Sequence, residues 1–272
     1  MPRGLLLRVF ISITFLGLLA FLYFKHPSRD RVTMVNVGQG DAFVLNIDNT
    51  LIVVDGGSGN DISYFLRTIH AKSCVIDYMF ITHFHADHVD GLLRLLDHCK
   101  VLNLYFNDTD SVNETVLGFT KSLYSSANVI HTHSLNKGDT LNIGDLEVLT
   151  LWPPASYSHD DPNFTSIVLL LKIKQFILFF PGDIDSTVLR TILKEHSILR
   201  NVDILKVPHH GSKYSYDPVL YEMLNPRIAF LSYGIDNNFG HPYMPLILLL
   251  NTLGTQIYST ANHGTVTVYL DT

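Results

Sequence analysis

The chain has 272 residues, of which 47% are hydrophobic and only 16% are charged. This length and composition support a substantial core and exclude a globally disordered chain. Residues 1–31 contain five of the 19 basic residues and only one of the 25 acidic residues. Residues 32–272 therefore contain 14 basic and 24 acidic residues and have a net charge of −10. A body this acidic argues against a protein that binds nucleic acid through a broad basic surface.

Two residue types narrow the chemistry. The chain contains 14 histidines, and histidine is both the commonest metal ligand and the side chain that titrates near neutral pH. The composition therefore raises the question of a metal or acid–base site. The two cysteines, Cys74 and Cys99, are too few for a disulfide framework and are compatible with either side of a membrane.

The N-terminal region predicts a membrane anchor. Leu5–Phe24 is almost entirely apolar, and a helix of this length spans roughly 30 Å, the thickness of a bilayer core. No small-x-small cleavage site follows, so we favour a retained single-pass anchor over a cleaved signal peptide or a buried helix. Basic residues flank both ends of this segment almost equally, so the positive-inside rule does not decide its orientation. Of the two membrane faces, we favour the extracytoplasmic one for the body of the protein. Residues 1–31 then hold the anchor and a short linker, and residues 32–272 form the body.

From Val32 onwards, apolar strands alternate with amphipathic helices. In chain order, the first half predicts strands at Thr33–Val37, Ala42–Ile47 and Leu51–Val54, a helix at Asp61–His70, a strand at Ile76–Thr82, a helix at Val89–Asp97, a strand at Val101–Phe106 and a helix at Asn113–Ser125. The second half predicts strands at Leu146–Trp152, Ile167–Lys174 and Phe176–Phe180, a helix at Ser186–His196, a strand at Asp203–Val207, a helix at Pro218–Leu224, a strand at Ile228–Ser232, a helix at Pro245–Leu253 and two final strands. This order fits two packed sheets with helices on both outer faces.

The motif Thr82-His83-Phe84-His85-Ala86-Asp87-His88 carries the strongest chemical signal. It follows a predicted buried strand and precedes a predicted helix, so it lies in a strand-to-helix loop. His83 and His85 can point to one metal ion, and Asp87 and His88 can turn to a second. Imidazole and carboxylate ligands at this density suit zinc, manganese or iron. Chance rarely produces this spacing between well-formed elements, so the motif predicts a metal centre.

This motif resembles the signature of the metallo-β-lactamase fold. Six further blocks resemble, in the same order, the C-terminal hydrolase domain of ComEC-type DNA-uptake proteins. These blocks are Val37–Ala42 (VGQGDA), Val54–Gly57 (VDGG), Asn163 with Ser166, Pro181–Asp183 (PGD), Lys206–Ser212 (KVPHHGS) and Gly240–Pro242 (GHP). The resemblance implies an α+β fold, the four-layer αββα sandwich of that family, here preceded by one predicted transmembrane helix.

The resemblance also implies two divalent metal ions, zinc or manganese. The residues that match the family's metal ligands are His83 and His85 for the first ion, Asp87, His88 and either His209 or His210 for the second, and Asp183 as a bridge between both. Successive side chains of a strand point to opposite sides, so one of the two adjacent histidines is expected to bind, and the sequence leaves open which. In isolation Asp183 would read as a helix N-cap, since a helix follows it.

Two departures from the family pattern matter. The wider superfamily supplies a third histidine to the first ion, whereas the matching region here holds Asn163 and Ser166. His159 lies nearby but in a segment that reads as a loop, so we expect a weak first site or one that prefers manganese, which accepts oxygen ligands more readily than zinc. Asn36 stands where relatives usually carry aspartate, which we expect to tune the site without abolishing it.

His241 lies between a glycine and a proline in a loop, where it could contact a substrate phosphate or donate a proton to a leaving group. Loop packing is the alternative role for His241. With it, six of the fourteen histidines belong to one proposed site. The expected catalytic residues are Asp87, Asp183 and His241, and the expected substrate-binding residues are Asn163, Ser166 and Ser212.

These residues predict hydrolysis by a metal-activated water. The resemblance implies a phosphodiesterase or nuclease acting on single- or double-stranded DNA, although the acidic body weakens the case for a nuclease. Because the sequence shows no multi-span channel like that of full-length DNA-uptake proteins, we expect either a free-standing nuclease or a hydrolase of smaller phosphoesters at the cell surface. Two alternatives remain: a metallohydrolase of a lactam, thioester or phosphocholine ester, and a non-catalytic subunit of an uptake complex.

Overall fold

Two seven-stranded sheets form the centre of the fold. The computed structural model describes residues 29–59, 61–69, 74–107, 118, 121 and 128–271. The first sheet runs in the order β14 (Val266–Tyr269), β1 (Arg31–Met34), β2 (Phe43–Ile47), β3 (Thr50–Val54), β4 (Cys74–Phe80), β5 (Cys99–Phe106) and β6 (Val129–Ser134). The second runs in the order β13 (Gln256–Ser259), β12 (Ile228–Leu231), β11 (Ile204–Lys206), β10 (Phe176–Phe180), β9 (Val168–Ile173), β8 (Leu146–Trp152) and β7 (Thr140–Ile143).

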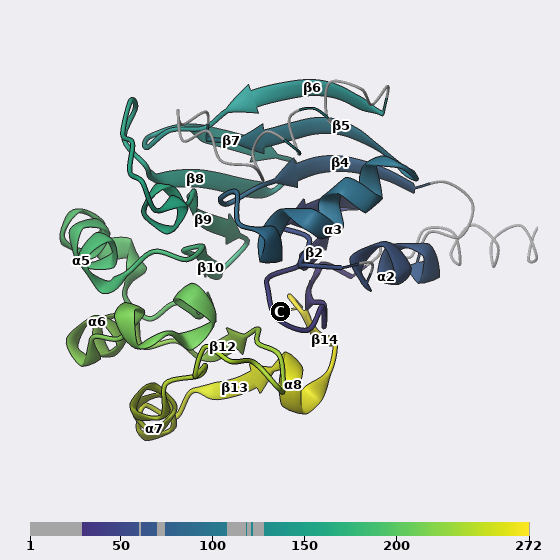
Figure 1. Ribbon diagram of the computed structural model, residues 1–272. Coiled ribbons are helices and arrows are strands. Elements are labelled where there is room, and N and C mark those ends of the chain that lie inside the picture. Colours follow the sequence, from purple (N-terminus) through teal and green to yellow (C-terminus); the bar gives the residue numbers. More distant parts are fainter. Residues whose placement is uncertain are drawn as a thin grey trace, which may run out of the picture.

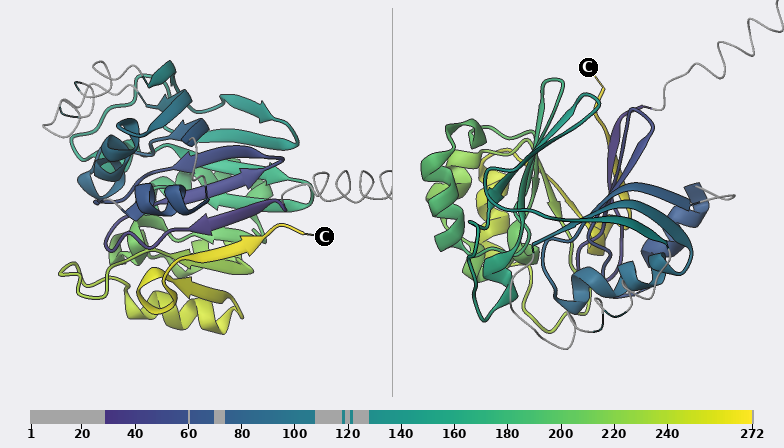
Figure 2. Two further views of the ribbon diagram at one scale, coloured as in Figure 1. Left: turned by 90° about the vertical axis from the view of Figure 1, so that its right-hand side faces the viewer. Right: turned by 90° about the horizontal axis from the view of Figure 1, so that it is seen from above.

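Helices cover the outer face of each sheet, which gives the αββα order of layers (Figures 1 and 2). The first sheet carries α2 (Asp61–Ile69) and α3 (Ala86–Leu96). The second carries α5 (Ser186–Glu195), α6 (Pro218–Leu224) and α7 (Met244–Thr252). The short helix α8 (Thr260–His263) joins β13 to β14. The expected four-layer sandwich is therefore confirmed for the described part of the chain.

Three layers of apolar side chains hold the sandwich together. Between the sheets, the Phe43 ring packs edge-on against Phe180 with ring centroids 5.1 Å apart. Beneath α3, Val89 and Leu92 are completely buried against the first sheet. α2 and α3 have the period of amphipathic helices, so each buries one apolar stripe and leaves its polar face in water.

Strand direction brings the loops of both sheets to one edge. In the first sheet β3, β4, β5 and β6 are parallel, and in the second β10, β11, β12 and β13 are parallel. Because ligands of such sheets bind outside the carboxyl ends of the strands, the loops that follow β3, β4, β10, β11 and β12 form the natural site. β2 runs antiparallel to β3, so the loop that precedes β2 lies at the same edge.

Most of the predicted elements are confirmed. The strands at Leu146–Trp152 and Phe176–Phe180 and the helix at Pro218–Leu224 have the expected bounds. The prediction omitted the edge strands β6 and β7. The side chains of β6 are mainly exposed, and β7 has only four residues, of which Ile143 alone is buried, so both give a weaker apolar signal than a core strand. The predicted helix Asn113–Ser125 lies almost wholly outside the described residues, as does the predicted anchor Leu5–Phe24.

The two cysteines form one disulfide between neighbouring strands. Cys74 begins β4 and faces Cys99, which begins β5. The bond closes a segment with a sequence separation of 25, and that segment contains the whole motif from Thr82 to His88. The disulfide therefore ties together the two strands that flank the motif and α3.

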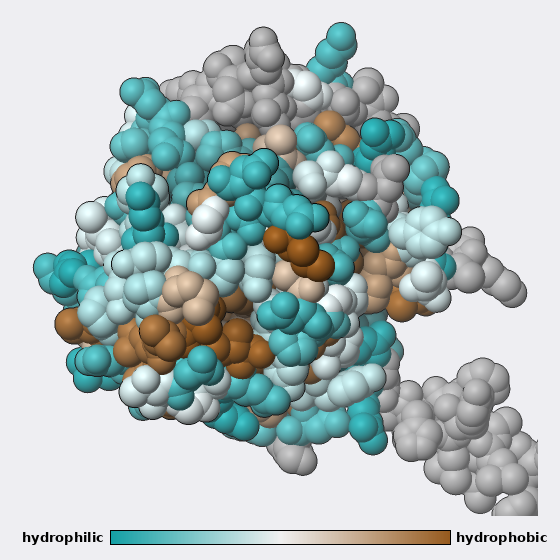
Figure 3. All heavy atoms as spheres, turned by 60° about the horizontal axis from the view of Figure 1, so that its bottom comes forward, coloured by the Kyte–Doolittle hydropathy of each residue, from teal (hydrophilic) through white to brown (hydrophobic). Residues whose placement is uncertain are grey.

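Hydrophobic side chains gather on the face of the molecule that carries α7 (Figure 3). α7 buries Leu246 and Leu250 but leaves Met244 and Leu248 largely exposed, so it is apolar on both sides. It is far too short to span a bilayer, and no helix within the described ranges has the length and apolarity to do so.

Candidate metal centre

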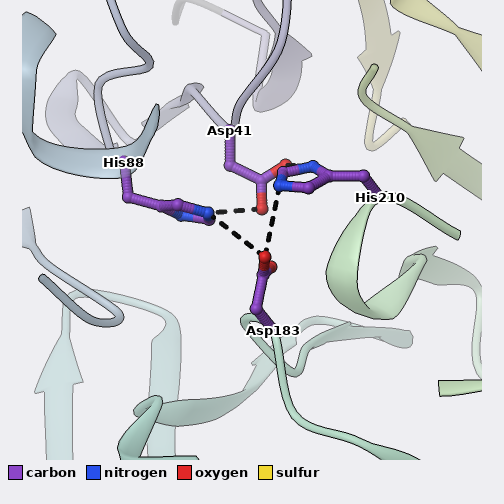
Figure 4. A group of neighbouring side chains, drawn as sticks. All are labelled: Asp41, His88, Asp183 and His210. Carbon is purple, nitrogen blue, oxygen red and sulfur yellow. Dashed lines mark ion pairs between the residues drawn. The ribbon is translucent and has the colours of Figure 1, made fainter. Parts of the chain in front are cut away.

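The candidate metal centre lies where loops of the two sheets meet at the carboxyl ends of the parallel strands. His88 comes from the start of α3, Asp183 from the loop after β10, His210 from the turn after β11 and Asp41 from the loop before β2 (Figure 4). One donor atom from each of these buried residues lies within 4.8 Å of the others. Segments far apart in the sequence thus bring two carboxylates and two imidazoles together.

Asp183 and Asp87 surround the two imidazoles with the spacing of ligands on one ion. Oδ2 of Asp183 lies 3.4 Å from Nε2 of His88 and 3.2 Å from Nε2 of His210. Oδ2 of Asp87 lies 3.3 Å from Nε2 of His210, and its Oδ1 lies 4.0 Å from Nε2 of His88. Zinc–ligand bonds of about 2.0–2.2 Å place neighbouring ligands of a tetrahedral ion roughly 3.3–3.6 Å apart. The four side chains therefore fit a divalent metal ion between them.

Hydrogen bonds at the opposite nitrogens orient both rings towards this point. Nδ1 of His210 lies 2.9 Å from the carbonyl oxygen of Ser232, which can only accept, so Nδ1 carries the proton. Nδ1 of His88 lies 2.9 Å from Oδ2 of Asp55 and donates to that carboxylate. Each neutral ring then presents the lone pair of Nε2, and neither Nε2 forms a hydrogen bond within the described ranges although both are buried. A buried lone pair beside carboxylates is satisfied by a cation.

The carboxylates also set the charge of both rings when no cation is bound. Burial by itself lowers the pKa of His88 and of His210, but Asp183 and the carboxylates around it reverse the effect and raise both pKa values well above the ordinary range. The centre therefore attracts positive charge. A bound divalent ion would supply that charge in place of the two protons.

Lys206 is a buried cation behind the centre. Its Nζ donates to Oδ1 of Asp183 at 2.8 Å and to the carbonyl oxygen of Gly182 at 2.7 Å, and it lies 2.5 Å from Oδ2 of Asp41. Burial would raise the pKa of Asp183, but the positive charges of His210 and Lys206 hold it well below its usual value. Lys206 thus fixes two carboxylates in their ionised form and leaves Oδ2 of Asp183 facing the imidazoles.

His83 and His85 lie next to this group and face each other. Nε2 of His83 is 3.1 Å from Nδ1 of His85, and the rings of His83 and His88 have centroids 4.1 Å apart. Burial lowers the pKa of His83 well below the usual value, so its ring is neutral. The ring nitrogens of His83 and His85 at this spacing could share one ion, which is compatible with the predicted first site.

The backbone after β11 separates the roles of His209 and His210. Both residues have left-handed conformations, with φ of 50° and 54°, so they form a tight turn instead of continuing a strand. Nε2 of His210 turns towards Asp87 and Asp183, whereas the amide of His209 donates to the carbonyl oxygen of Gly182 and its ring packs 5.6 Å from His241. The expectation of alternating strand side chains was wrong in its geometry, because the strand already ends at Lys206. Non-glycine residues in this region are strained and concentrate at functional sites.

His241 stands beside the two histidines of this turn. Its ring centroid lies 5.6 Å from that of His209 and 6.2 Å from that of His210. Burial, together with the charges of His210 and His209, lowers the pKa of His241 to about 4, so the ring is neutral near pH 7. Its Nδ1 is buried and forms no hydrogen bond with any described residue.

The predicted substrate-binding residues have structural contacts. Ser166 is completely buried, and its Oγ accepts a hydrogen bond from the amide of Asp183 at 3.2 Å. Oγ of Ser212 accepts from the amide of Tyr214 in the short helix that follows. Asn163 is half-buried, and its Oδ1 finds no hydrogen-bond partner among the described residues. Direct contact of these three with a substrate stays a prediction.

The two departures from the family pattern also have defined positions. His159 is exposed, stacks on Phe164 with ring centroids 4.1 Å apart and accepts a hydrogen bond from the amide of Asp161. It is absent from the group of donor atoms at the centre. Asn36 is exposed, and its Oδ1 accepts from the amide of Gly38, so its side chain stabilises a turn.

Sequence reasoning missed four residues that support the centre. Asp41 and Asp55 lie inside recognised blocks, and Asp55 also accepts from the amide and hydroxyl of Thr82 at 2.8 and 2.6 Å. Lys206 opens another recognised block, and Ser232, whose hydroxyl donates to Asp41, ends a predicted strand. All four are polar residues at the ends of apolar strands, a signal that could have marked them.

Comparison with known proteins agrees with this geometry. Residues 35–235 match the model of the Metallo-beta-lactamase superfamily. ComE operon protein 3 of Bacillus subtilis is 26% identical over 90% of this chain, and Recombination protein 2 of Haemophilus influenzae is 24% identical over 91%. The chain spans only 34% and 30% of the length of these two relatives. Ribonuclease Z of Methanopyrus kandleri is 32% identical over 45% of this chain and 40% of its own length.

Solved structures show the same fold. The metallo-beta-lactamase fold protein YhfI from Bacillus subtilis superposes with a TM-score of 0.60 at 12% identity, over 88% of this chain and the whole of that one. The match of the family model covers most of the chain, including His83, Asp87, Asp183 and His210. The chain therefore belongs to the metallo-β-lactamase superfamily, in which it resembles the ComEC-type proteins.

Proposed function

We propose that this protein is a metal-dependent phosphodiesterase whose preferred substrate is DNA. The observation that carries the proposal is the convergence of Nε2 of His88 and Nε2 of His210, both buried and without a hydrogen bond in the described ranges, on the carboxylates of Asp87 and Asp183. The resemblance to ComEC-type proteins over about nine-tenths of the chain supports a substrate related to DNA. The partial similarity to Ribonuclease Z supports phosphodiester hydrolysis.

The chain offers ligands for two ions, and we expect one site to bind its ion more tightly than the other. Asp87, His88, Asp183 and His210 would hold one divalent ion, zinc or manganese. His83 and His85 would hold a second, which lacks the third histidine of the wider superfamily, and Asp183 would contribute to both sites. Lys206 donates to Oδ1 of Asp183, so Oδ2 is the oxygen left to face the imidazoles. When bound, the ions supply Lewis acidity and lower the pKa of water so that it becomes a nucleophile near neutral pH.

Residues around the ligands keep them in position. Asp55 holds Nδ1 of His88 and Ser232 holds Nδ1 of His210, so neither ring can turn away from the centre. Lys206 compensates the charges of Asp41 and Asp183 in a site from which water is largely excluded. This arrangement limits the reorganisation needed when a phosphate oxyanion approaches the centre.

His241 is proposed to contact the substrate. It lies beside the metal-facing turn, and its ring is neutral near pH 7. A neutral imidazole can donate one N–H to a phosphoryl or leaving-group oxygen. This contact would orient the scissile bond towards the nucleophile.

The disulfide supports an extracytoplasmic position for the hydrolase body. Structural disulfides persist in oxidising compartments and are rare in the cytosol. The bond between Cys74 and Cys99 therefore favours the outer face of the membrane. The anchor at Leu5–Phe24 stays a prediction.

The full chain, purified in detergent and loaded with Mn²⁺ or Zn²⁺, should hydrolyse bis(p-nitrophenyl) phosphate and single-stranded DNA. Asp183→Ala should lose most of its metal in elemental analysis and its activity on both substrates. Asp145→Ala, which removes an exposed carboxylate, serves as the matched control and should retain both. If neither substrate is hydrolysed with Mn²⁺ or with Zn²⁺, the phosphodiesterase proposal is rejected.

A further inference from the structure

The side chain of Asn237 forms four hydrogen bonds within the loop at residues 234–243. Nδ2 of Asn237 donates to the carbonyl oxygens of Gly234 and His241 at 2.8 and 2.9 Å. Its Oδ1 accepts from the amides of Phe239 and His241 at 3.2 and 3.1 Å. Four hydrogen bonds from one residue fix the backbone on both sides of Phe239, so this loop presents its tip in a defined position.

Phe239 occupies that tip and is 69% exposed. Its ring lies nearly parallel to that of His241, with an angle of 16° between the planes and centroids 5.9 Å apart. His241 in turn lies beside His209 and His210. A series of rings therefore leads from the candidate metal centre to solvent and ends in an apolar aromatic face.

The negative charge around Phe239 limits which part of a nucleic acid its exposed ring can bind. The body carries a net charge of −10, to which the exposed Asp236 of this loop contributes, so electrostatic attraction for a phosphate backbone is weak here. Every nucleobase has a flat π-face, so any of the bases can stack on an exposed aromatic ring. In a duplex that face is already stacked and paired, whereas in a single strand it is free.

We propose that Phe239 stacks on an unpaired nucleobase and thereby selects single-stranded nucleic acid for the metal centre. This inference rests on the proposed function, because it assumes that the phosphodiester next to that base reaches the centre. Phe239 is a substrate-binding residue in this proposal, since it contacts the base and not the reacting phosphate.

The test measures binding with and without bases on one backbone. The probe is a fluorescein-labelled phosphorothioate oligothymidylate, which resists hydrolysis, and its counterpart has abasic sugars throughout. With the full chain and Mn²⁺, fluorescence anisotropy should show about tenfold tighter binding of the base-bearing strand, a typical effect of one stacked base. In Phe239→Ala this preference should fall to within about twofold, and Phe239→Trp should restore it.

Ile235→Ala is the matched control. Ile235 is 75% exposed on the same loop but lies outside the series of rings, so its removal should leave the preference for bases unchanged. Thermal melting of each variant shows whether the fold is intact. A single-stranded probe should also bind more tightly than the same strand in a duplex.

The outcomes separate this inference from the proposed function. Equal binding of base-bearing and abasic strands by the wild-type chain overturns the role of Phe239, even where bis(p-nitrophenyl) phosphate is hydrolysed. A preference that survives in Phe239→Ala overturns it as well. A preference that Phe239→Ala abolishes supports it, even where no phosphodiester is cleaved and the proposed hydrolysis fails.

Discussion

The two carboxylate oxygens of Asp183 have different partners because Lys206 binds one of them. Oδ1 accepts a hydrogen bond from Nζ of Lys206 at 2.8 Å, and Oδ2 faces the imidazoles of His88 and His210. A buried lysine in this position compensates negative charge from behind and leaves one oxygen available in front. The pair therefore couples the stability of the fold to the charge of the metal centre.

Lys206→Met should destabilise the metal-free protein strongly. The substitution keeps an unbranched apolar side chain but removes the ammonium group, so Asp41 and Asp183 stay buried without the cation of Lys206, which costs about 3–5 kcal/mol of unfolding free energy. A divalent ion should recover much of this loss, so the stabilisation produced by metal should be larger in the variant than in the wild type. Urea unfolding in EDTA and in Mn²⁺ measures both quantities.

Lys172→Met provides the control for that experiment. Lys172 pairs with Glu147 at 3.2 Å on the surface, where an ion pair contributes at most about 1 kcal/mol. Equal losses in the two lysine variants would contradict the central role of Lys206.

His210→Asn and His209→Asn should differ in metal binding. Asparagine tolerates the left-handed backbone of both positions, so each variant removes an imidazole with little added strain. His210→Asn removes a ligand and should bind metal at least about tenfold more weakly, whereas His209→Asn should retain it. Elemental analysis after dialysis distinguishes the two, and a loss confined to His209→Asn would reverse the assignment.

Asp55→Asn should weaken metal binding without removing a ligand. Asp55 fixes the orientation of His88 through Nδ1, and loss of such a supporting carboxylate lowers metal affinity by about 10- to 100-fold. Competition with a chromophoric chelator gives the dissociation constant. Asp77→Asn removes another carboxylate that accepts from a backbone amide, that of Leu51, and should leave the affinity unchanged.

Reduction of the disulfide should destabilise the domain that carries the motif. The bond between Cys74 and Cys99 closes a segment with a sequence separation of 25, and it lowers the entropy of the unfolded chain by an amount worth roughly 3 kcal/mol of stability. The double variant Cys74→Ser/Cys99→Ser should unfold at lower urea concentration than the oxidised wild type, and wild type in dithiothreitol should match the variant. A double variant that unfolds at the same urea concentration as the oxidised wild type would contradict this contribution of the bond.

Local patterns were enough to predict the elements that the core requires. Strands such as Phe176–Phe180 and helices such as Pro218–Leu224 bury apolar residues at the spacing typical of a strand or a helix. This spacing can be recognised from residues that are neighbours in the sequence. The edge strands β6 and β7 bury little and therefore left no such signal. The motif from His83 to His88 was recognisable for the same reason, because its histidines and Asp87 are close in the chain.

The sequence by itself determined the histidine- and aspartate-rich motif and predicted the sandwich of two sheets that carries it. Only the tertiary structure decided that His210 and not His209 faces Asp183, because that choice depends on a left-handed turn after β11. The tertiary structure also brought Asp41, Asp55 and Lys206 behind the proposed ligands, from the loop before β2, the loop after β3 and the end of β11. Spacing along the chain predicts the candidate ligands, whereas their orientation and charge compensation follow from contacts between residues that only folding makes neighbours.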